Sequence, residues 1–391
     1  MSIEFRDLKR QYKVIKGAVD EQINTVIASS HFISGSQVKE LEKILAEYVG
    51  RKHCITCGNG TDAISIALKA AGVGDGKDAV FVPDFTFFSS GECPAIVGAI
   101  PIFVDVRKDT YNIDSESLVA AVEKVILEGE LHPKAVVAVD LFGQPFDHDA
   151  IRSVCDKYGM LLLEDAAQGF GGEYITEAGE KKMAGSLGDI STTSFFPAKP
   201  LGCYGDGGAI FTDDDNLAMY CRSIAVHGKD MEHPDDQNAK YNNIRLGTNS
   251  RLDTIQAGIL MAKFPMFKGE ELDKVNHVAS RYTEQLADTG LTLPIIGERY
   301  YSSWAQYTVQ LPEGIERIEI QKKLKSDGIP TNIYYIKPMH KQGAFVGTRS
   351  SEANCPNTEN LCNRVLCLPI HPYLEDGEID FIVEKFKAAI S

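Results

Sequence analysis

Between residues 50 and 255, short apolar runs alternate with helical segments, and this alternation limits the folds open to the chain more than any other feature. Strands that are separated by helices form mainly parallel sheets, with helices covering both faces. The strand-like runs are residues 53–56, 79–82, 101–104, 135–139, 160–164, 190–195 and 208–212, and helical patterns lie at 61–71, 115–128 and 149–158. We therefore predict an α/β fold with a mainly parallel seven-stranded sheet between layers of helices.

The pattern changes after about residue 255, where a long helical stretch begins. Pro265 lies inside that stretch and should kink or break the helix, because proline lacks a backbone N–H. We therefore predict a large domain of residues 1–255 and a smaller α+β domain of residues 256–391. Before the boundary, residues 229–246 are polar and are expected to form a long loop, a kind of segment that often carries function. Beyond it we expect a helical stretch at 254–288, a strand at 304–311, a helix at 316–327 and a closing helix at 376–389.

The charge balance of the chain argues against a nucleic-acid partner. Its 55 acidic side chains against 40 basic ones give a net charge of −15, which repels phosphate backbones. No apolar run approaches the ~20 residues that cross a bilayer. The first residues also lack the apolar core of a secretion signal. We therefore expect a cytoplasmic protein without a membrane or nucleic-acid partner.

The nine cysteines do not predict a metal site. Cys54 and Cys57 have the C-x-x-C spacing, but no second pair follows at the distance of a zinc ribbon. Cys355, Cys362 and Cys367 are spaced too irregularly for a known ligand set. Reduced thiols are the simplest account in a chain without an export signal, and we expect no metal.

Lys199 stands in a segment with an unusual backbone. It lies just past a predicted buried strand, between Pro197 and Pro200, and four glycines follow within residues 202–208. A lysine that such a turn removes from water has a lowered pKa, which an amine that forms a Schiff base requires. Taken alone, a lysine in a turn is more often a surface residue. Two further motifs change that balance.

The first of these motifs ends the strand predicted at residues 160–164. Asp165 and Gln168 follow it, and ligands of α/β sheets bind outside the carboxyl ends of the strands. Pyridoxal 5'-phosphate (PLP) needs a carboxylate against its pyridine nitrogen, because a protonated ring is the better electron sink. Asp165 could supply that carboxylate, and Gln168 could bind the ring hydroxyl oxygen.

The second motif, residues 58–63, follows a short strand and opens a helix. Its glycines let the backbone approach a phosphate, which the helix N-terminus attracts. The same residues satisfy the dinucleotide pattern G-x-G-x-x-A, and Asp84 lies near the place of the acidic residue that this pattern requires. A nicotinamide-dependent oxidoreductase therefore stays open as an alternative. Phe87 follows the next strand, where an aromatic side chain could stack on a cofactor ring.

Together these segments resemble the DegT/DnrJ/EryC1/StrS family of sugar aminotransferases, which have the fold-type-I PLP-dependent architecture. The likeness runs from about residue 3 to the end and includes the motifs at residues 60–63, 164–168, 194–208, 249–253, 329–342 and 368–374. It implies that Lys199 carries the cofactor as a Schiff base and later moves the proton. The other implied cofactor contacts are Asp165 to the pyridine nitrogen, Gln168 to the ring hydroxyl, Phe87 over the ring, and Gly60, Thr61 and Ser194 to the phosphate, with Asn249 arriving from a second subunit.

The same resemblance implies a homodimer with shared active sites and glutamate as the amino donor. It is most specific, through residues 302–307 and 338–342, for enzymes that aminate position 3 of a UDP-linked 2-acetamido-3-keto-glucuronic acid. Arg251 and His340 would then face the sugar carboxylate. Another nucleotide-linked keto-hexose is the alternative substrate. A regulatory protein that binds PLP without turnover is a further alternative, although intact Lys199, Asp165 and Gln168 argue against it.

Overall fold

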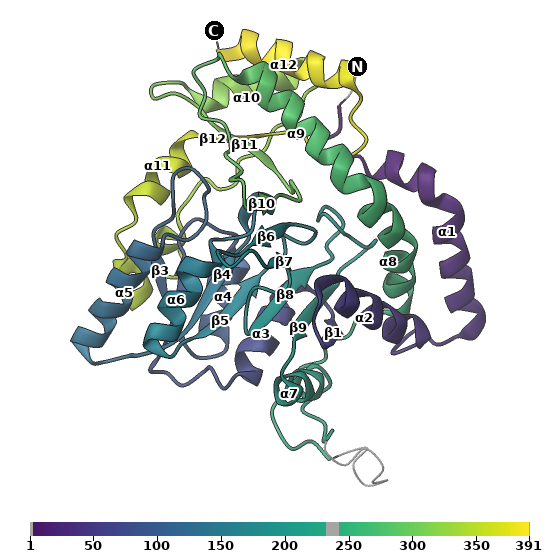
Figure 1. Ribbon diagram of the computed structural model, residues 1–391, viewed down its shortest axis with the longest axis vertical. Coiled ribbons are helices and arrows are strands. Elements are labelled where there is room, and N and C mark those ends of the chain that lie inside the picture. The colour runs from purple at the N-terminus through teal and green to yellow at the C-terminus, as the bar shows by residue number, and fades with distance from the viewer. Residues whose placement is uncertain (1–2, 232–241, 391) are drawn as a thin grey trace.

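The computed structural model describes residues 3–231 and 242–390, and its centre is a seven-stranded sheet (Figure 1). In spatial order the strands are β1 (His53–Cys57), β9 (Gly208–Thr212), β8 (Ile190–Ser194), β5 (Leu161–Asp165), β4 (His132–Val139), β2 (Asp78–Pro83) and β3 (Ile100–Val104). The four pairings among β8, β5, β4, β2 and β3 are parallel, whereas β9 runs antiparallel to both β8 and β1. All seven predicted strands are present, and the predicted fold class is confirmed.

Helices cover both faces of this sheet because its central strands are apolar on both sides. In β4, Val137 packs into one core and Val136 into the other, and neighbouring positions alternate in the same way. One core includes residues of α3 (Gly60–Ala70), α4 (Phe88–Ile96) and α7 (Asp215–Ala225). The opposite core includes residues of α5 (Ser115–Glu128) and α6 (His148–Tyr158). The polar residues that follow the strands are thereby left at the carboxyl edge of the sheet.

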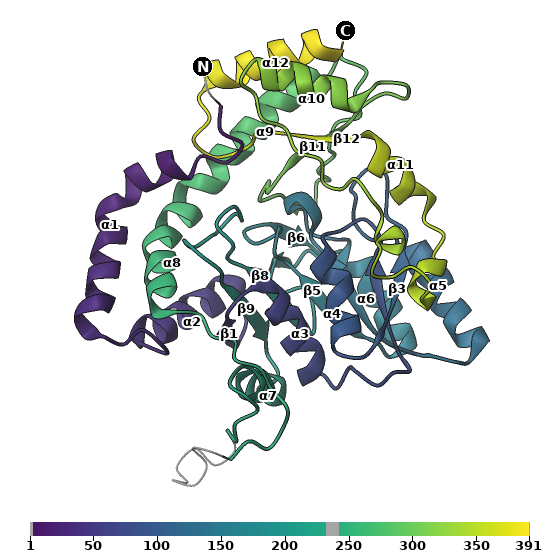
Figure 2. The same ribbon diagram turned by 180° about the vertical axis from the view of Figure 1, so that it is seen from behind.

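Two N-terminal helices that the sequence pattern did not predict pack beside α8 (Thr254–Met266). They are α1 (Leu8–Ser29) and α2 (Ser36–Val49), and Figure 2 shows α1 alongside α8 from behind. Pro265 does not end the helical stretch. A π-helical turn (Phe267–Glu271) follows α8 directly and leads into α9 (Leu272–Leu286), so the helix continues with a local change of winding.

The C-terminal part has its own core, built on a two-stranded antiparallel sheet of β11 (Tyr307–Gln310) and β12 (Val365–Leu368). Helices α9, α10 (Arg317–Ser326) and α12 (Asp376–Ile390) pack on it, and α11 (Pro356–Arg364) precedes β12. The strand predicted at residues 304–311 is shorter, because Trp304 has a φ of 48° and leaves the extended conformation. A domain boundary after residue 255 stays a prediction.

The remaining elements are small. β6 (Glu173–Ile175), β7 (Lys181–Met183) and β10 (Tyr300–Tyr301) form a three-stranded sheet that the sequence pattern did not predict. Of the loop predicted at residues 229–246, the part at 232–241 lies outside the described residues, and Lys229 bridges to Asn243 at its base. In the described part of the chain, no helix is both long and apolar enough to span a bilayer.

Candidate cofactor site

A cavity of about 910 Å³ opens at the carboxyl edge of the sheet, where α/β proteins bind their ligands. Its walls come from the segments that follow β1, β2, β5 and β8, which are brought together although they lie far apart in the sequence. Seven of the ten residues predicted for the site line this cavity: Gly60, Thr61, Phe87, Asp165, Gln168, Ser194 and Lys199. Asn249, Arg251 and His340 do not.

Lys199 and Asp165 are the charged pair in the depth of this cavity. Removal from water lowers the pKa of Lys199, and the charge of Asp165 only partly opposes that effect. Burial raises the pKa of Asp165, against a hydrogen bond from Ser90 and the charge of Lys199. A buried carboxylate with a raised pKa lacks a full counter-charge. It is therefore suited to a cationic ring nitrogen, and a lysine with a lowered pKa is suited to nucleophilic attack.

Asp165 is held rigidly at the end of β5. Its Oδ2 accepts a hydrogen bond of 2.8 Å from the hydroxyl of Ser90, and its Oδ1 accepts one of 3.2 Å from the backbone N–H of Ala167. Ser90 lies in α4 and was not among the predicted site residues. Only its place in the segment after β2, close to Phe87, could have indicated it.

Gln168 has its amide orientation fixed by the backbone. The N–H of Phe142 donates to Gln168 Oε1 over 2.9 Å, so Nε2 is the end that remains to donate. Nε2 bonds the hydroxyl of Tyr335 over 3.1 Å, and both side chains line the cavity. The amide thus presents a donor, which matches a ring oxygen that carries negative charge. Tyr335 lies inside a motif that the sequence singled out, but the residue itself was not predicted.

The N-terminus of α3 forms a cradle with the polar groups that a phosphate needs. Asn59 caps the helix, since its side chain accepts a hydrogen bond of 2.8 Å from the N–H of Asp62. The hydroxyls of Thr61 and Ser89 are 2.7 Å apart at the same end. Gly60 is the first residue of the helix and lies against Ser194. Backbone N–H groups and hydroxyls at a helix N-terminus are the usual partners of a phosphate.

Gly60→Ala is expected to weaken this cradle. A Cβ at position 60 would lie 2.7 Å from the Cβ of Ser194, which is shorter than any ordinary contact, so Ser194 or the helix must move. We expect a loss of about 1–3 kcal/mol in the free energy of unfolding and at least about tenfold weaker PLP binding. Thermal unfolding and a fluorescence titration with PLP measure both.

Gly17→Ala is the matched control, because a Cβ at position 17 of α1 meets nothing within 4 Å. It should bind PLP as the wild type does and be stabilised by roughly 0.5–1 kcal/mol, as alanine is in a helix interior. Equal PLP affinities in the two variants would contradict a phosphate contact at Gly60.

Phe87 stands on the wall of the cavity and is 54% exposed. Its ring lies 6.5 Å from that of Tyr335, centroid to centroid. Phe196, at 52% exposure, and Ile336, at 69%, are also apolar side chains left uncovered, and Phe196 shares the cavity wall. Aromatic residues that remain this exposed at the wall of a cavity indicate a surface that a ligand or another chain covers.

Asn249 and Arg251 are exposed and lie just before α8. Between them, the hydroxyl of Ser250 accepts a hydrogen bond of 2.9 Å from the N–H of Gly58, so the segment is fixed next to the phosphate cradle of its own chain. Neither side chain lines the cavity of that chain. Asn249 is predicted to reach the cofactor site of a second subunit, and Arg251 is predicted to contact the sugar carboxylate. Both roles stay predictions.

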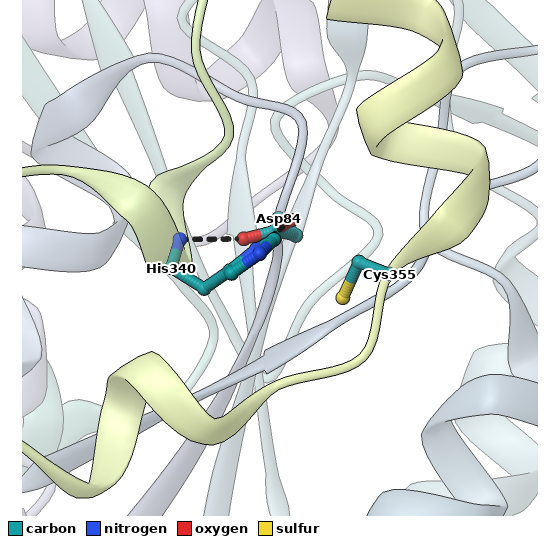
Figure 3. Close-up of side chains that lie close together, drawn as sticks. All are labelled: Asp84, His340 and Cys355. Atoms are coloured by element: carbon teal, nitrogen blue, oxygen red, sulfur yellow. Dashed lines mark hydrogen bonds and ion pairs between the residues drawn. The ribbon is translucent and has the colours of Figure 1, made fainter.

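His340 is buried and paired with Asp84 (Figure 3). Its Nδ1 lies 2.7 Å from Asp84 Oδ2, and its backbone N–H donates to Asp84 Oδ1 over 2.8 Å. The hydrogen bond between the His340 imidazole and the Asp84 carboxylate raises the pKa of His340. The pair ties the end of β2 to the segment that contributes Met339 and Gln342 to the cavity wall. Contact of His340 with a sugar carboxylate stays a prediction.

The sulfur of Cys355 completes a compact group with this pair, all three ligand atoms lying within 4.8 Å of one another. Both oxygens of Asp84 already accept hydrogen bonds from His340. Burial raises the pKa of the Cys355 thiol, which keeps it protonated and makes it a poor metal ligand. The same pairing occupies the carboxylate that a dinucleotide ribose would need, so Asp84 does not support the oxidoreductase alternative.

Comparison with known proteins decides between the alternatives. Residues 13–387 match the DegT/DnrJ/EryC1/StrS aminotransferase family. The chain belongs to this family. It is 43% identical over 97% of its length, and 98% of the relative, to a UDP-2-acetamido-2-deoxy-3-oxo-D-glucuronate aminotransferase of Pseudomonas aeruginosa. It is 40% identical over 98% of both chains to a pleiotropic regulatory protein of Geobacillus stearothermophilus. A crystal structure of a family aminotransferase from Brucella abortus superimposes with a TM-score of 0.92, at 41% identity over 99% of both chains.

As a member of this family, the protein is an aminotransferase, and PLP is its cofactor. The nicotinamide-dependent oxidoreductase is therefore set aside. The residues of the cavity fit PLP: a lysine with a lowered pKa, a buried carboxylate that lacks a full counter-charge, an amide donor, and a helix N-terminus with hydroxyls for the phosphate.

Proposed function

We propose that this aminotransferase transfers the amino group of glutamate to position 3 of a UDP-linked 2-acetamido-2-deoxy-3-oxo-glucuronic acid in the cytoplasm. The observation that carries the proposal is the Lys199–Asp165 pair in a cavity of about 910 Å³, which has room for a nucleotide-linked sugar beside the cofactor. The substrate follows the Pseudomonas aeruginosa relative, which matches along nearly the whole chain. Another nucleotide-linked keto-hexose is the alternative.

The seven predicted residues that line the cavity each have a role in this reaction. When bound, the cofactor supplies an electron sink for the bond that is broken. Lys199 Nζ would take the proton from the substrate carbon and pass it to the cofactor, which its lowered pKa favours. Asp165 holds the ring nitrogen in its cationic form, and Gln168 Nε2 donates to the ring oxygen. Gly60, Thr61 and Ser194 hold the phosphate, and Phe87 covers the ring and keeps water away from it.

A second subunit would complete the site. Among the described residues that line the cavity, Lys199 is the only lysine or arginine, whereas Asp62, Asp165 and Asp206 are acidic. A substrate that carries a diphosphate and a carboxylate needs more positive charge than this wall offers. We propose a homodimer in which Asn249 of one protomer binds the cofactor phosphate of its partner and Arg251 binds the sugar carboxylate. Such a dimer would also cover the exposed apolar side chains around the cavity.

Shared sites predict complementation between two inactive variants. Lys199→Ala and Arg251→Glu, each inactive alone, are co-expressed and the mixed dimers assayed. In a dimer with shared sites, each mixed pair has one site with both substitutions and one with neither. Random pairing should therefore restore about one quarter of wild-type activity in a symmetric dimer. A mixture that stays inactive, although mass spectrometry shows mixed dimers, would contradict a shared site.

The substrate is tested with the purified enzyme, glutamate and two UDP-linked 3-keto-sugars that differ only in the carboxylate at carbon 6. Mass spectrometry follows the amino sugar, and a coupled assay follows 2-oxoglutarate. We expect the uronate to be preferred by at least about tenfold in kcat/KM, the effect of one charge-assisted hydrogen bond of roughly 1.5 kcal/mol or more. Equal turnover of both sugars would contradict the uronate and leave the wider class of keto-hexoses.

The first half of the reaction can be measured by itself. The Geobacillus stearothermophilus relative carries the name of a regulatory protein, and a protein that only binds PLP would not react with glutamate. We expect this aminotransferase to convert its cofactor to pyridoxamine phosphate within a single turnover when glutamate is added. Rapid-mixing absorbance spectroscopy measures this step directly.

A further inference from the structure

A second, smaller cavity shares Lys199 with the cofactor site. Buried and half-buried polar and charged side chains from three parts of the chain meet in it: Arg6, Gln11, Lys263, Glu271, His371 and Tyr373. None of them has a role in the proposed reaction. Burying polar groups costs free energy, so a cluster of them beside the proposed catalytic lysine indicates a functional role.

Arg6 makes the direct contact with the segment that carries Lys199. Its Nη2 donates a hydrogen bond of 3.1 Å to the backbone carbonyl of Lys199, across 193 positions of sequence. The N–H of Lys199 in turn donates to the carbonyl of Phe196 over 2.9 Å. The peptide groups on both sides of the Lys199 side chain are therefore held, and Pro200 restricts the backbone further. Arg6 Nη1 is buried and has no hydrogen-bond partner among the described residues.

Arg6 is itself fixed from both sides along the chain. Before it, the N–H of Ile3 donates to the carbonyl of Gly328 over 3.3 Å. After it, Arg10 forms a two-pronged pair with Glu378, with distances of 2.6 and 2.7 Å. The guanidinium group therefore projects toward Lys199 from a short segment that is anchored to the C-terminal part of the fold.

Two cationic side chains besides Lys199, those of Arg6 and Lys263, line the smaller cavity together with the carboxylates of Asp7 and Glu271. Lys263 donates to the carbonyl of Gly202, in the same loop as Lys199. Glu271, placed by the π-helical turn, accepts hydrogen bonds of 2.7 Å from Gln11 and 2.6 Å from Tyr373. It is the carboxylate that faces Arg6 and Lys263, and the remaining acid, Asp7, caps α1 and contacts Arg10.

The charged groups around Lys199 have opposite effects on its pKa. On the cofactor side it faces Asp165, whose charge favours the ammonium form, and Asp62 and Asp206 lie on the same cavity wall. Tyr334 and Tyr335 on that wall have raised pKa values and stay neutral. On the other side, burial lowers the pKa of His371 to about 4, so that it is neutral too. Arg6 adds to the effect of burial in lowering the pKa of Lys199.

We propose that Arg6 is a positioning residue for Lys199, holding the peptide that carries the catalytic amine and placing a buried positive charge behind it. Two consequences follow from one guanidinium group. The hydrogen bond limits the directions in which the lysine side chain leaves the backbone, and the charge favours the neutral amine that the reaction needs. This inference rests on the proposed role of Lys199 as the cofactor lysine.

The test measures Lys199 in the full-length enzyme freed of cofactor, so that it does not depend on turnover. Acetic anhydride labels the neutral amine, and peptide mass spectrometry gives the labelling rate of Lys199 as a function of pH. In Arg6→Gln the amide can still donate to the Lys199 carbonyl, but the charge is lost. We expect labelling at pH 8 to slow by about three- to tenfold and the profile to move to higher pH, because one pKa unit changes the neutral fraction tenfold.

Arg10→Gln is the matched control. It loosens the same N-terminal segment by breaking the pair with Glu378, but Arg10 does not touch Lys199. The labelling rate of Lys199 in Arg10→Gln should depend on pH as it does in the wild type. Arg6→Lys keeps a charge without the planar fork, and its profile should move less than that of Arg6→Gln. Should Arg6→Gln fail to fold, Arg6→Lys still tests the proposal. A labelling rate of Lys199 at pH 8 that is slower by tenfold or more in Arg6→Lys than in the wild type would overturn it.

Three further results would overturn the proposal: an unchanged profile in Arg6→Gln, an equal displacement in Arg10→Gln, or a larger one in Arg6→Lys than in Arg6→Gln. Borohydride reduction of the wild type with bound PLP tests the underlying assignment separately. Reduction that fixes the cofactor to another residue would overturn the role of Lys199 itself, whatever the Arg6 variants show.

Discussion

Lys199→Ala is expected to lower kcat by at least about a thousandfold, within the range that a positioned general acid and base contributes, before the loss of the covalent cofactor link is added. The structure gives the reason: Lys199 is the only lysine or arginine among the described residues that line the cofactor cavity, so no neighbouring amine can replace it. A steady-state assay that follows 2-oxoglutarate measures the loss.

The fold should tolerate this change. Lys199 is held through its backbone by Arg6 and Phe196, and its amine is removed from water at a cost, so the side chain adds little to stability. Circular dichroism and thermal unfolding should match the wild type. Lys43→Ala, at a position on α2 whose side chain is 71% exposed, is the control and should keep full activity. Retention of most of the activity in Lys199→Ala would remove the basis of the proposed mechanism.

Asp165→Asn is expected to lower kcat by at least about a hundredfold, the lower end of the range for a group that controls a proton in the transition state. Asparagine has nearly the same shape and can still accept the hydrogen bond from Ser90, but it cannot balance a cationic ring nitrogen. The cofactor should therefore still bind, while its power to withdraw electrons falls. Pre-steady-state kinetics with glutamate would show slow proton transfer.

Two observations separate this effect from simple misfolding. The substitution removes a buried carboxylate whose pKa burial has raised, so the free energy of unfolding should be equal to or higher than that of the wild type near neutral pH. Asp156→Asn, on the exposed side of α6, is the control and should leave kcat unchanged. A kcat within threefold of the wild type for Asp165→Asn would contradict a contact between this carboxylate and the ring.

Much of the fold could be predicted because its signals are local. Several strands of the central sheet, such as β4 and β5, contain continuous apolar runs, and helices such as α5 begin and end at recognisable capping residues, Asp114 and Gly129. The N-terminal helices α1 and α2 were missed although their amphipathic patterns are no weaker than that of α5, because they lie before the alternation of strands and helices on which the prediction rests. The π-helical turn after Pro265 has no sequence signal that separates it from a kink.

Some residues of the site could likewise be predicted from the sequence, and others could not. Residues in motifs at the ends of strands, such as Asp165 and Lys199, could be selected from the sequence because the carboxyl ends of parallel strands meet at one edge. Ser90, Tyr335 and Arg6 could not, because each acts through a hydrogen bond to a site residue that only the folded chain brings near. Arg6 is 193 positions from Lys199, and nothing local predicts their contact.

The central claim is that Lys199 holds PLP and that glutamate donates the amino group. The most direct test is the absorbance spectrum of the purified protein, before and after glutamate is added. We expect a band near the edge of the visible range that moves to shorter wavelength with glutamate and returns when 2-oxoglutarate is added in excess. A protein that stays colourless after incubation with PLP, or a band that glutamate leaves unchanged, would contradict the account.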